Sequence, residues 1–240
     1  MTLPFDDLFL LPFLTGLCFA LLLPALGCYL RLRDEWLAAL TYAQVSAAGA
    51  LGAMAVAAPL AAGGGVAALL AAVIKNLTSR HRASGAAYAL LLLAGWACSV
   101  LLVANLPTAE RMGHALFDGQ LYFTDGVHLA AAAGWGLVAL VLLRSLSRRL
   151  LLARLYPDFF QARGLAVWPA QLGFDLLAAG SLALATMSLG VMGAFALVFI
   201  PAWSAFARAV NWRRAIVQAT LLGCATYCLA FALALRWDQP

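Results

Sequence analysis

The residue types best suited to binding a metal ion gather in one polar stretch of the chain, residues 113–128. This stretch holds two histidines and two aspartates, His114, Asp118, Asp125 and His128. Imidazole nitrogens and carboxylate oxygens are ligands that zinc and manganese accept, so the stretch is a candidate metal site. The spacing matches no established metal-binding motif. The alternative is that all four are solvated loop residues, with the two aspartates capping helices.

A second candidate is Asp175, a carboxyl group that lies inside a long apolar run. Burying an ionisable side chain in lipid is costly, so such a residue is a candidate for function. Asp175 could face a water-filled path through the protein. It could equally be a structural carboxyl group that is hydrogen-bonded near Arg144 or Arg148.

Three further polar side chains, Tyr42, Gln44 and Ser46, lie within another apolar run. Polar side chains within a membrane span are costly to bury in lipid, so these three are candidates for function. A glutamine carbonyl is a neutral oxygen donor and a weak ligand for zinc. The alternative is that Gln44 forms a hydrogen bond with a neighbouring helix.

The composition indicates that membrane-spanning helices must position all these residues. Of the 240 residues, 65% are hydrophobic and 10% are charged, and the mean hydropathy is +0.94. A soluble domain cannot cover so much apolar surface, so we predict an all-α, polytopic integral membrane protein with one domain, residues 1–240. Eight apolar stretches are long enough, or nearly so, to cross a bilayer: residues 8–30, 37–58, 60–74, 85–105, 127–143, 169–189, 191–207 and 215–235.

The loop charges predict the orientation of these spans. The loops 75–84, 144–167 and 208–214 are strongly basic, whereas the loop 106–126 carries acidic and basic residues together. Basic loops stay in the cytoplasm, so we predict that loop 106–126 is periplasmic and that both chain ends lie outside. The net charge of +5 therefore reports topology rather than a nucleic-acid-binding surface.

A short polar segment, residues 156–165, interrupts the apolar sequence between two predicted spans. Pro157 suits the first position of a helix, Asp158 suits its positive end, and Gly164 can end it. The same segment contains two aromatic residues that offer anchor area for an interface, and a basic residue: Phe159, Phe160 and Arg163. We predict a short amphipathic helix at the cytoplasmic face, which either docks on a partner protein or lies on lipid headgroups.

Three stretches together resemble one family of membrane proteins. Residues 157–164, with Pro-Asp followed by Ala and Gly, resemble a coupling-helix motif. Residues 190–205, Gly-Val-Met-Gly-Ala-Phe-Ala-Leu-Val-Phe-Ile-Pro-Ala-Trp-Ser-Ala, resemble a turn followed by a proline-containing span, and 116–119 with 124–127 are similar to a Leu-Phe-Gly-Asp loop. The family comprises the permease subunits of bacterial ABC importers for zinc, manganese and iron (the ABC-3 family).

The resemblance implies a transmembrane permease subunit that works by alternating access in the bacterial inner membrane. A separate ABC ATPase, carrying ATP and Mg, would drive it through segment 156–165. A periplasmic substrate-binding protein would deliver the cargo, and a second permease copy would complete a homodimer. The cargo would be a divalent transition metal, zinc or manganese before iron, and this chain would bind no cofactor of its own.

The sequence has no P-loop and no hydrolase motif, which indicates a non-enzymatic subunit that depends on another chain for ATP hydrolysis. The alternatives to a metal permease are an ion-coupled carrier, a non-transporting membrane protein, and an ABC permease for a non-metal or chelated-metal cargo.

The sequence departs from the family in two places. Members usually carry Asp-x-x-x-His on the second span, one helical turn apart, so that both side chains can share a metal ion. The matching positions here are Leu40 and Gln44, so we predict no tight, charged metal site in that span. We expect Gln44, with Tyr42 or Ser46 beside it, to line a pore that conducts the cargo without holding it tightly. The family also continues beyond an Asp-x-Pro with one more span, whereas this sequence ends at Asp238-Gln239-Pro240. Either this member lacks the last helix or the sequence is shortened.

Overall fold

The computed structural model describes residues 7–78, 84–119, 121, 124–156, 158, 160, 163 and 166–237. The regular structure within these residues is helical throughout, which confirms the predicted all-α class. The helices are α1 (Asp7–Arg33), α2 (Leu37–Ala55), α3 (Leu60–Thr78), α4 (Ser84–Asn105), α5 (Pro107–Asp118), α6 (Gly126–Leu155), α8 (Trp168–Phe206) and α9 (Trp212–Trp237).

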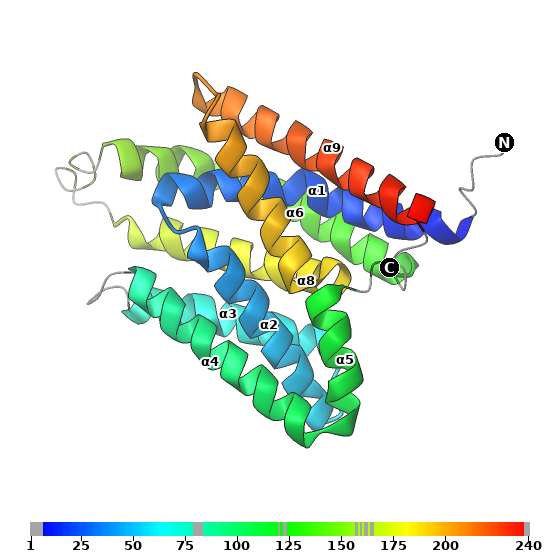
Figure 1. The fold of residues 1–240 in the computed structure, drawn as a ribbon. Helices are drawn as coiled ribbons and strands as arrows, with labels where there is room; N and C mark the ends of the chain where they lie inside the picture. The colour runs from blue at the N-terminus through cyan, green and yellow to red at the C-terminus, as the bar shows by residue number, and fades with distance from the viewer. Residues whose placement is uncertain are drawn as a thin grey trace.

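Seven of the described helices are long and apolar enough to cross a membrane; α5 is the exception. The 39 residues of α8 contain two of the eight predicted spans, because the helix breaks at Gly190 and the chain turns back there (Figure 1). The predicted spans 169–189 and 191–207 are therefore the two halves of α8.

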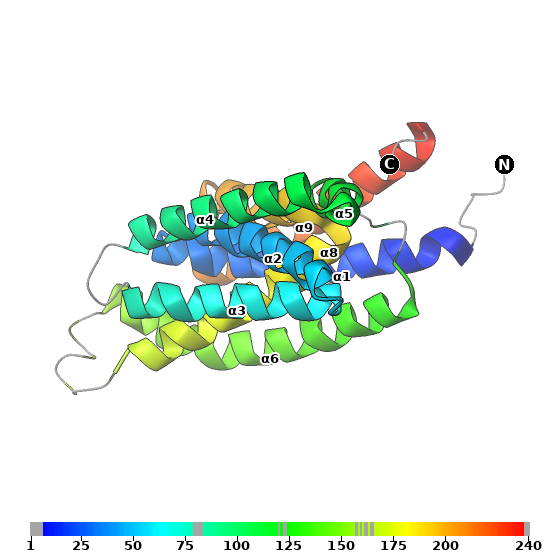
Figure 2. The same cartoon turned by 90° about the horizontal axis from the view of Figure 1, so that it is seen from below.

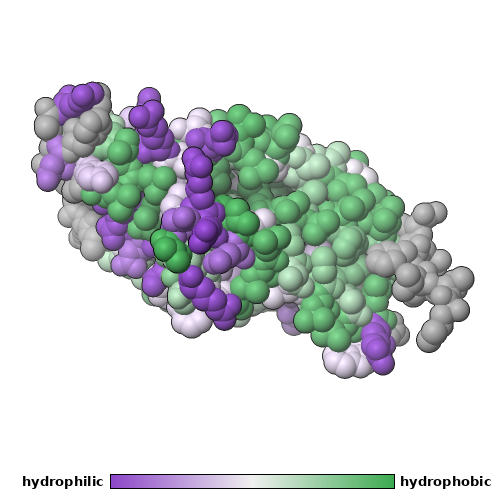
Figure 3. All heavy atoms as spheres, turned by 90° about the horizontal axis from the view of Figure 1, so that it is seen from above, coloured by the Kyte–Doolittle hydropathy of each residue, from purple (hydrophilic) through white to green (hydrophobic). Residues whose placement is uncertain are grey.

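The helix ends that flank the loops predicted to be cytoplasmic lie at one end of the molecule, on the left of Figure 1. We call this the basic end; it contains the end of α1, the end of α3, the start of α4, the end of α6 and the α8–α9 junction. The start of α1, α5 and the end of α9 lie at the opposite end. On the face in Figure 3, most hydrophilic residues gather toward the basic end, and hydrophobic residues cover most of the remainder.

Helix packing places α2 at the centre of one half of the molecule. Figure 2 shows α3 and α4 on its two sides, and α2 contacts both helices as well as α8. A Cβ added at Gly49 of α2 would lie 2.6 Å from the carbonyl oxygen of Gly63 in α3. This close approach explains the use of glycine at the contact, because small residues let transmembrane helices pack backbone to backbone.

The structure corrects two sequence-based boundaries. The predicted outer loop 106–126 contains a helix, α5, whose buried face carries Ala109, Gly113 and Leu116. Its first residue is Pro107, which suits a helix start. The span predicted as 127–143 continues as α6 to Leu155, so much of the predicted loop 144–167 is helical. Both differences arise because hydropathy locates the apolar run but does not locate the end of the helix.

Gly190 makes the turn inside α8 possible. Its backbone has φ 75° and ψ 169°, a conformation that residues other than glycine rarely adopt. Gly119, just after α5, also has a positive φ, and a Cβ added at Gly190 would lie 2.6 Å from its backbone nitrogen. The reversal of α8 is therefore packed directly against the end of α5.

Candidate functional site

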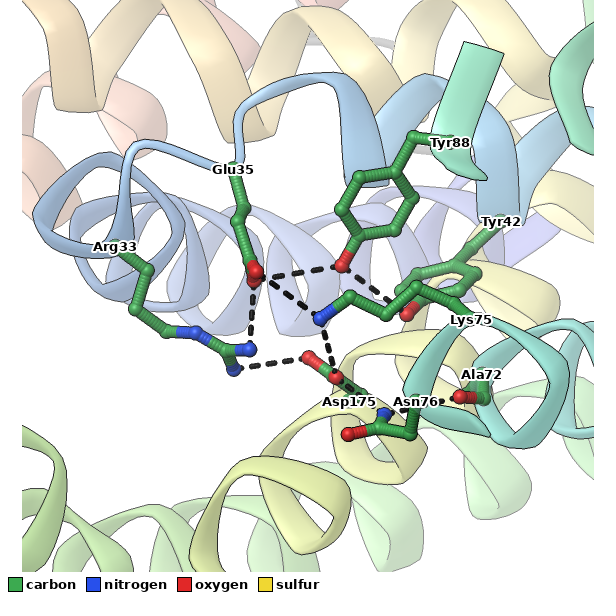
Figure 4. Close-up of polar contacts among 8 residues, drawn as sticks. All are labelled: Arg33, Glu35, Tyr42, Ala72, Lys75, Asn76, Tyr88 and Asp175. Atoms are coloured by element: carbon green, nitrogen blue, oxygen red, sulfur yellow. Dashed lines mark hydrogen bonds and ion pairs between the residues drawn. The ribbon is translucent and has the colours of Figure 1, made fainter. Parts of the chain in front are cut away.

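Asp175 lies at the centre of a buried group of charged side chains near the basic end (Figure 4). Its Oδ1 accepts a hydrogen bond from Arg33 Nη1 at 2.8 Å. Its Oδ2 accepts bonds from Lys75 Nζ at 2.8 Å and from Asn76 Nδ2 at 2.6 Å. The Asp175 side chain is completely buried, and each oxygen already has a charged partner.

Glu35 is the second carboxylate of this group. It forms ion pairs with Arg33 at 2.6 Å and with Lys75 at 3.0 Å. Tyr88 donates a hydrogen bond to Glu35 at 3.4 Å, and the hydroxyl groups of Tyr88 and Tyr42 lie 3.4 Å apart. We call Arg33, Glu35, Lys75, Asn76, Tyr88 and Asp175 the charge cluster.

The local fold explains how these residues meet. Arg33 is the last residue of α1, and Asp34 follows it with φ 59°. Aspartate tolerates this left-handed conformation better than most residues. The turn is closed by a hydrogen bond from the Glu35 amide to the Leu30 carbonyl at 2.9 Å. The chain thus reverses within two residues, and Arg33 and Glu35 both reach the cluster.

The remaining cluster residues come from three other helices. Lys75 and Asn76 are consecutive residues near the end of α3, and Asn76 also donates to the Ala72 carbonyl at 3.0 Å. Tyr88 lies near the start of α4 and Asp175 near the start of α8. The cluster therefore joins α1, the α1–α2 turn, α3, α4 and α8.

The cluster contains two cations and two carboxylates, so its charges balance. The four charged side chains are between 0% and 10% exposed. Buried charges are tolerated when they are paired and hydrogen-bonded, which is the case here. The cations also lie over aromatic rings: Arg33 is 5.0 Å from the Phe174 ring centroid, and Lys75 is 5.0 Å from that of Tyr88.

A cavity of about 150 Å³ borders the cluster at the basic end. Arg33 and Glu35 form one side of it, and the end of α6 and the start of α8 supply Arg154 and Gln171. The described residues contain no group of three or more metal-ligating side chains here or elsewhere. Each charged group of the cluster is paired with a group from another helix or turn, so the cluster joins the elements that carry it.

The predicted path residues are buried inside this single chain. The Gln44 side-chain nitrogen lies 3.4 Å from the Ser99 hydroxyl of α4, to which it donates a long hydrogen bond. Tyr42 lies beside the charge cluster (Figure 4). Ser46 is buried, and its hydroxyl has no hydrogen-bond partner among the described residues. The partners expected for Asp175 are wrong: Arg144 and Arg148 are exposed on α6, and Arg33 and Lys75 take their place.

The outer residues proposed as metal ligands have a different arrangement. Asp125 caps α6, accepting hydrogen bonds at 3.0 Å from the amides of Val127 and His128, and its carboxylate lies 2.6 Å from His128 Nδ1. The hydrogen bond from the His128 amide has the largest effect and lowers the pKa of Asp125 below its usual value. The bond from the His128 ring lowers it further. His114 and Asp118 lie on α5 and are exposed. Asp125 therefore has the capping role given as the alternative.

The segment 156–165 is described only in part. Asp158 is exposed, Phe160 is buried, and Arg163 is exposed in a turn. Pro157, Phe159 and Gly164 lie outside the described residues. The Phe160 side chain is only 8% exposed, so within this chain it presents little of the anchor area that the sequence suggested.

Sequence reasoning found Asp175 but missed the other residues of the charge cluster. Lys75 lies in the basic loop 75–84, which was used only to predict topology, and the sequence suggested no role for Arg33 or Glu35. The signal that could have found them is Asp175 itself, because a buried carboxylate requires buried cations close by. The sequence offers few cations at the edges of the apolar runs, and Arg33 and Lys75 are two of them.

The sequence profile described as the ABC 3 transport family matches residues 6–240. The chain belongs to the ABC 3 transport family. No curated protein matches it significantly.

Two solved structures share the fold of this ABC 3 permease. PsaBC from Streptococcus pneumoniae, solved in complex with Fab, superposes with a TM-score of 0.81 at 19% identity, covering 98% of this chain and 85% of the other. An inward-facing conformation of a proposed metal-chelate type ABC transporter superposes with a TM-score of 0.78 at 18% identity. This match covers 99% of this chain and 83% of the other. The protein is thus a multi-pass membrane permease of an ABC transporter.

Proposed function

We propose that this permease imports a divalent transition metal (zinc, manganese or iron) across the bacterial inner membrane. The observation that carries the proposal is the family match, which extends over residues 6–240. In this proposal a homodimer works with a separate ATPase and a periplasmic binding protein, and ATP and Mg bind to the ATPase. His114, Asp118, Asp125 and His128 then contribute exposed polar groups at the end that the binding protein would meet.

Uptake by the reconstituted transporter tests this proposal. The permease is co-expressed with its ATPase, purified and placed in lipid vesicles with the binding protein. We expect ATP-dependent accumulation of at least one of zinc, manganese and iron, and a stable complex of permease and ATPase. Accumulation without an ATPase would favour an ion-coupled carrier, and no complex with an ATPase would contradict the proposal.

A chelated metal is the second candidate cargo. The positions that match the family's Asp-x-x-x-His are Leu40 and Gln44, and leucine has no atom that can ligate a metal. A chelate brings its own ligands and needs no charged site on the second span. The structural relative of the metal-chelate type has a similar fold. Uptake of iron only when a chelator is supplied would favour this candidate over the free ion.

We further propose that segment 156–165 docks on the ATPase. Asp158 has a helical backbone and an exposed side chain, whereas the Phe160 side chain is buried. Asp158→Lys should therefore weaken ATPase binding without lowering the melting temperature (Tm) of the permease. Phe160→Ala should lower the Tm, because it removes a buried aromatic side chain.

A bulky residue at Gly164 should also weaken docking, because the sequence predicts that this glycine ends the helix and a large side chain would hinder such an ending. Gly164→Trp is compared with Asp158→Lys by co-purification with the ATPase and by stimulation of ATP hydrolysis. Unchanged stimulation in both variants would show that the segment lies on lipid headgroups instead.

A further inference from the structure

We propose that Asp175 is the positioning residue through which movement of segment 156–165 reaches the other helices of the membrane domain. This inference rests on the proposed coupling role of that segment. It gives the charge cluster a role in transport in addition to its role in stabilising the fold.

The first argument is the position of Asp175 along the chain. Segment 156–165 is followed directly by α8, which begins at Trp168. Asp175 lies in the same unbroken helical stretch, roughly 10 Å along the axis from Trp168. A displacement of the start of α8 should therefore carry Asp175 with it, because backbone hydrogen bonds join each turn of this stretch to the next.

The second argument is what Asp175 holds. Its two oxygens bind Arg33 of α1 and Lys75 and Asn76 of α3, at distances of 2.6–2.8 Å. Glu35 binds the same two cations from the α1–α2 turn. Separating Asp175 from these partners would leave unpaired charges in a region with little access to water, which is strongly unfavourable. We therefore expect α1, α3 and the start of α8 to move together.

The third argument is the contrast with α6, the helix that enters segment 156–165. Four arginines lie on the last part of α6, and none of them pairs with a carboxylate of another described residue: Arg144, Arg148, Arg149 and Arg154. The bonds that α6 makes to α1 and α8 are neutral, from Tyr29 to Ser147 at 2.7 Å and from Trp135 to Ser181 at 2.9 Å. The helix on the α8 side of the segment is thus tied to its neighbours by ion pairs, whereas the four arginines of α6 are not.

A balanced pair of variants separates transmission from stability. Asp175→Asn leaves two cations facing one carboxylate and should lower the Tm. Adding Lys75→Met removes one cation and restores the charge balance, with Arg33 and Glu35 still paired. Replacing a buried ion pair by neutral residues often preserves stability, whereas removing one partner does not. The double variant should therefore regain the Tm and ATPase binding of the wild type.

Uptake by the double variant decides the proposal. If Asp175 transmits movement, the double variant should bind and stimulate the ATPase normally, yet transport less metal per ATP hydrolysed, by about tenfold. Wild-type uptake in the double variant would overturn the inference, because the cluster would then serve stability alone. A wild-type protein without ATP-dependent uptake would instead contradict the proposed function, so the two failures are distinguishable.

A distance measurement on the intact cluster keeps the inference testable if the double variant fails to fold. Spin labels replace Leu77 on α3 and Gln171 on α8, both exposed, in a cysteine-free background of the complete transporter. ATP should leave the 77–171 distance unchanged and alter the distance between Gln171 and a label at Arg149 on α6. A change in the 77–171 distance on ATP binding would overturn the inference.

Discussion

The two ends of this permease use similar side chains in opposite ways. At the basic end, Asp175 and Glu35 are almost fully buried and are bound to Arg33 and Lys75. At the opposite end, Asp125 is exposed, caps a helix and contacts His128, its neighbour three residues along the chain. The first arrangement joins several helices across the sequence, whereas the second acts within one turn.

The comparison shows that environment, not residue type, decides what a carboxylate contributes. A buried carboxylate without its cations is strongly destabilising, because the protein cannot solvate the charge. An exposed carboxylate is hydrated when its partner is lost, and its interactions are screened by water and salt. Substitutions at the two ends should therefore have very different effects, and the following predictions test that difference.

The largest effect is expected for Lys75→Met. The substitution leaves two buried carboxylates, Asp175 and Glu35, with Arg33 as the remaining cation of the cluster. We expect a loss of about 3–5 kcal/mol of stability, the usual cost of breaking a buried ion pair. Denaturation of the purified protein in detergent micelles measures it.

Arg154→Met is the matched control, because Arg154 is an exposed cation beside the same cavity. An exposed substitution should change stability by less than about 0.5 kcal/mol. Equal losses in the two variants would show that burial does not distinguish these cations.

The second prediction concerns the turn inside α8. Gly190→Ala adds a Cβ to a residue at φ 75°, and that atom would lie 2.6 Å from the Gly119 nitrogen. We expect a loss of about 1–3 kcal/mol from backbone strain alone. Gly193→Ala, three residues along, is the control, because its Cβ would only touch the Leu189 Cβ at 3.4 Å. A stability loss at Gly193 equal to that at Gly190 would argue against a special backbone conformation.

The third prediction uses Gln44, which the sequence placed on the cargo path and which the structure shows beside Ser99. If Gln44 lines the path, Gln44→Leu should reduce uptake while the protein stays folded. Ser99→Ala removes two neutral hydrogen bonds, the one from Gln44 and the one that Ser99 donates to the Gly95 carbonyl. Each should be worth about 1 kcal/mol or less. Uptake at the wild-type level in Gln44→Leu would leave the residue a purely structural role.

The smallest effect is expected for Asp125→Asn. The hydrogen bonds from His128 lower the pKa of Asp125 in the folded protein, so the ionised carboxylate stabilises the fold above its ordinary pKa of 3.8. That contribution is lost as the pH falls through the lowered value. The Tm difference between wild type and variant should thus be small at pH 7 and vanish in strong acid. A difference that grew on acidification would contradict this sign.

Much of the fold could be predicted from the sequence, because hydropathy is a local property. A span needs about 20 consecutive apolar residues, so the eight spans could be located without knowing their neighbours. The turn at Gly190 followed from the glycine and the apolar runs on both sides of it. The family followed from short motifs around residues 116–127, 157–164 and 190–205, and the match over residues 6–240 confirms it.

The charge cluster could not be predicted in this way. Asp175 pairs with residues 142 and 100 positions away, and its sequence neighbours say nothing about which helices will pack against it. Helices that are apolar all round have almost no periodic pattern to mark the buried face. The sequence by itself determined that this protein crosses the membrane and which apolar stretches form its long helices. Only the tertiary structure decided which charges meet, because that depends on packing between helices distant in the chain.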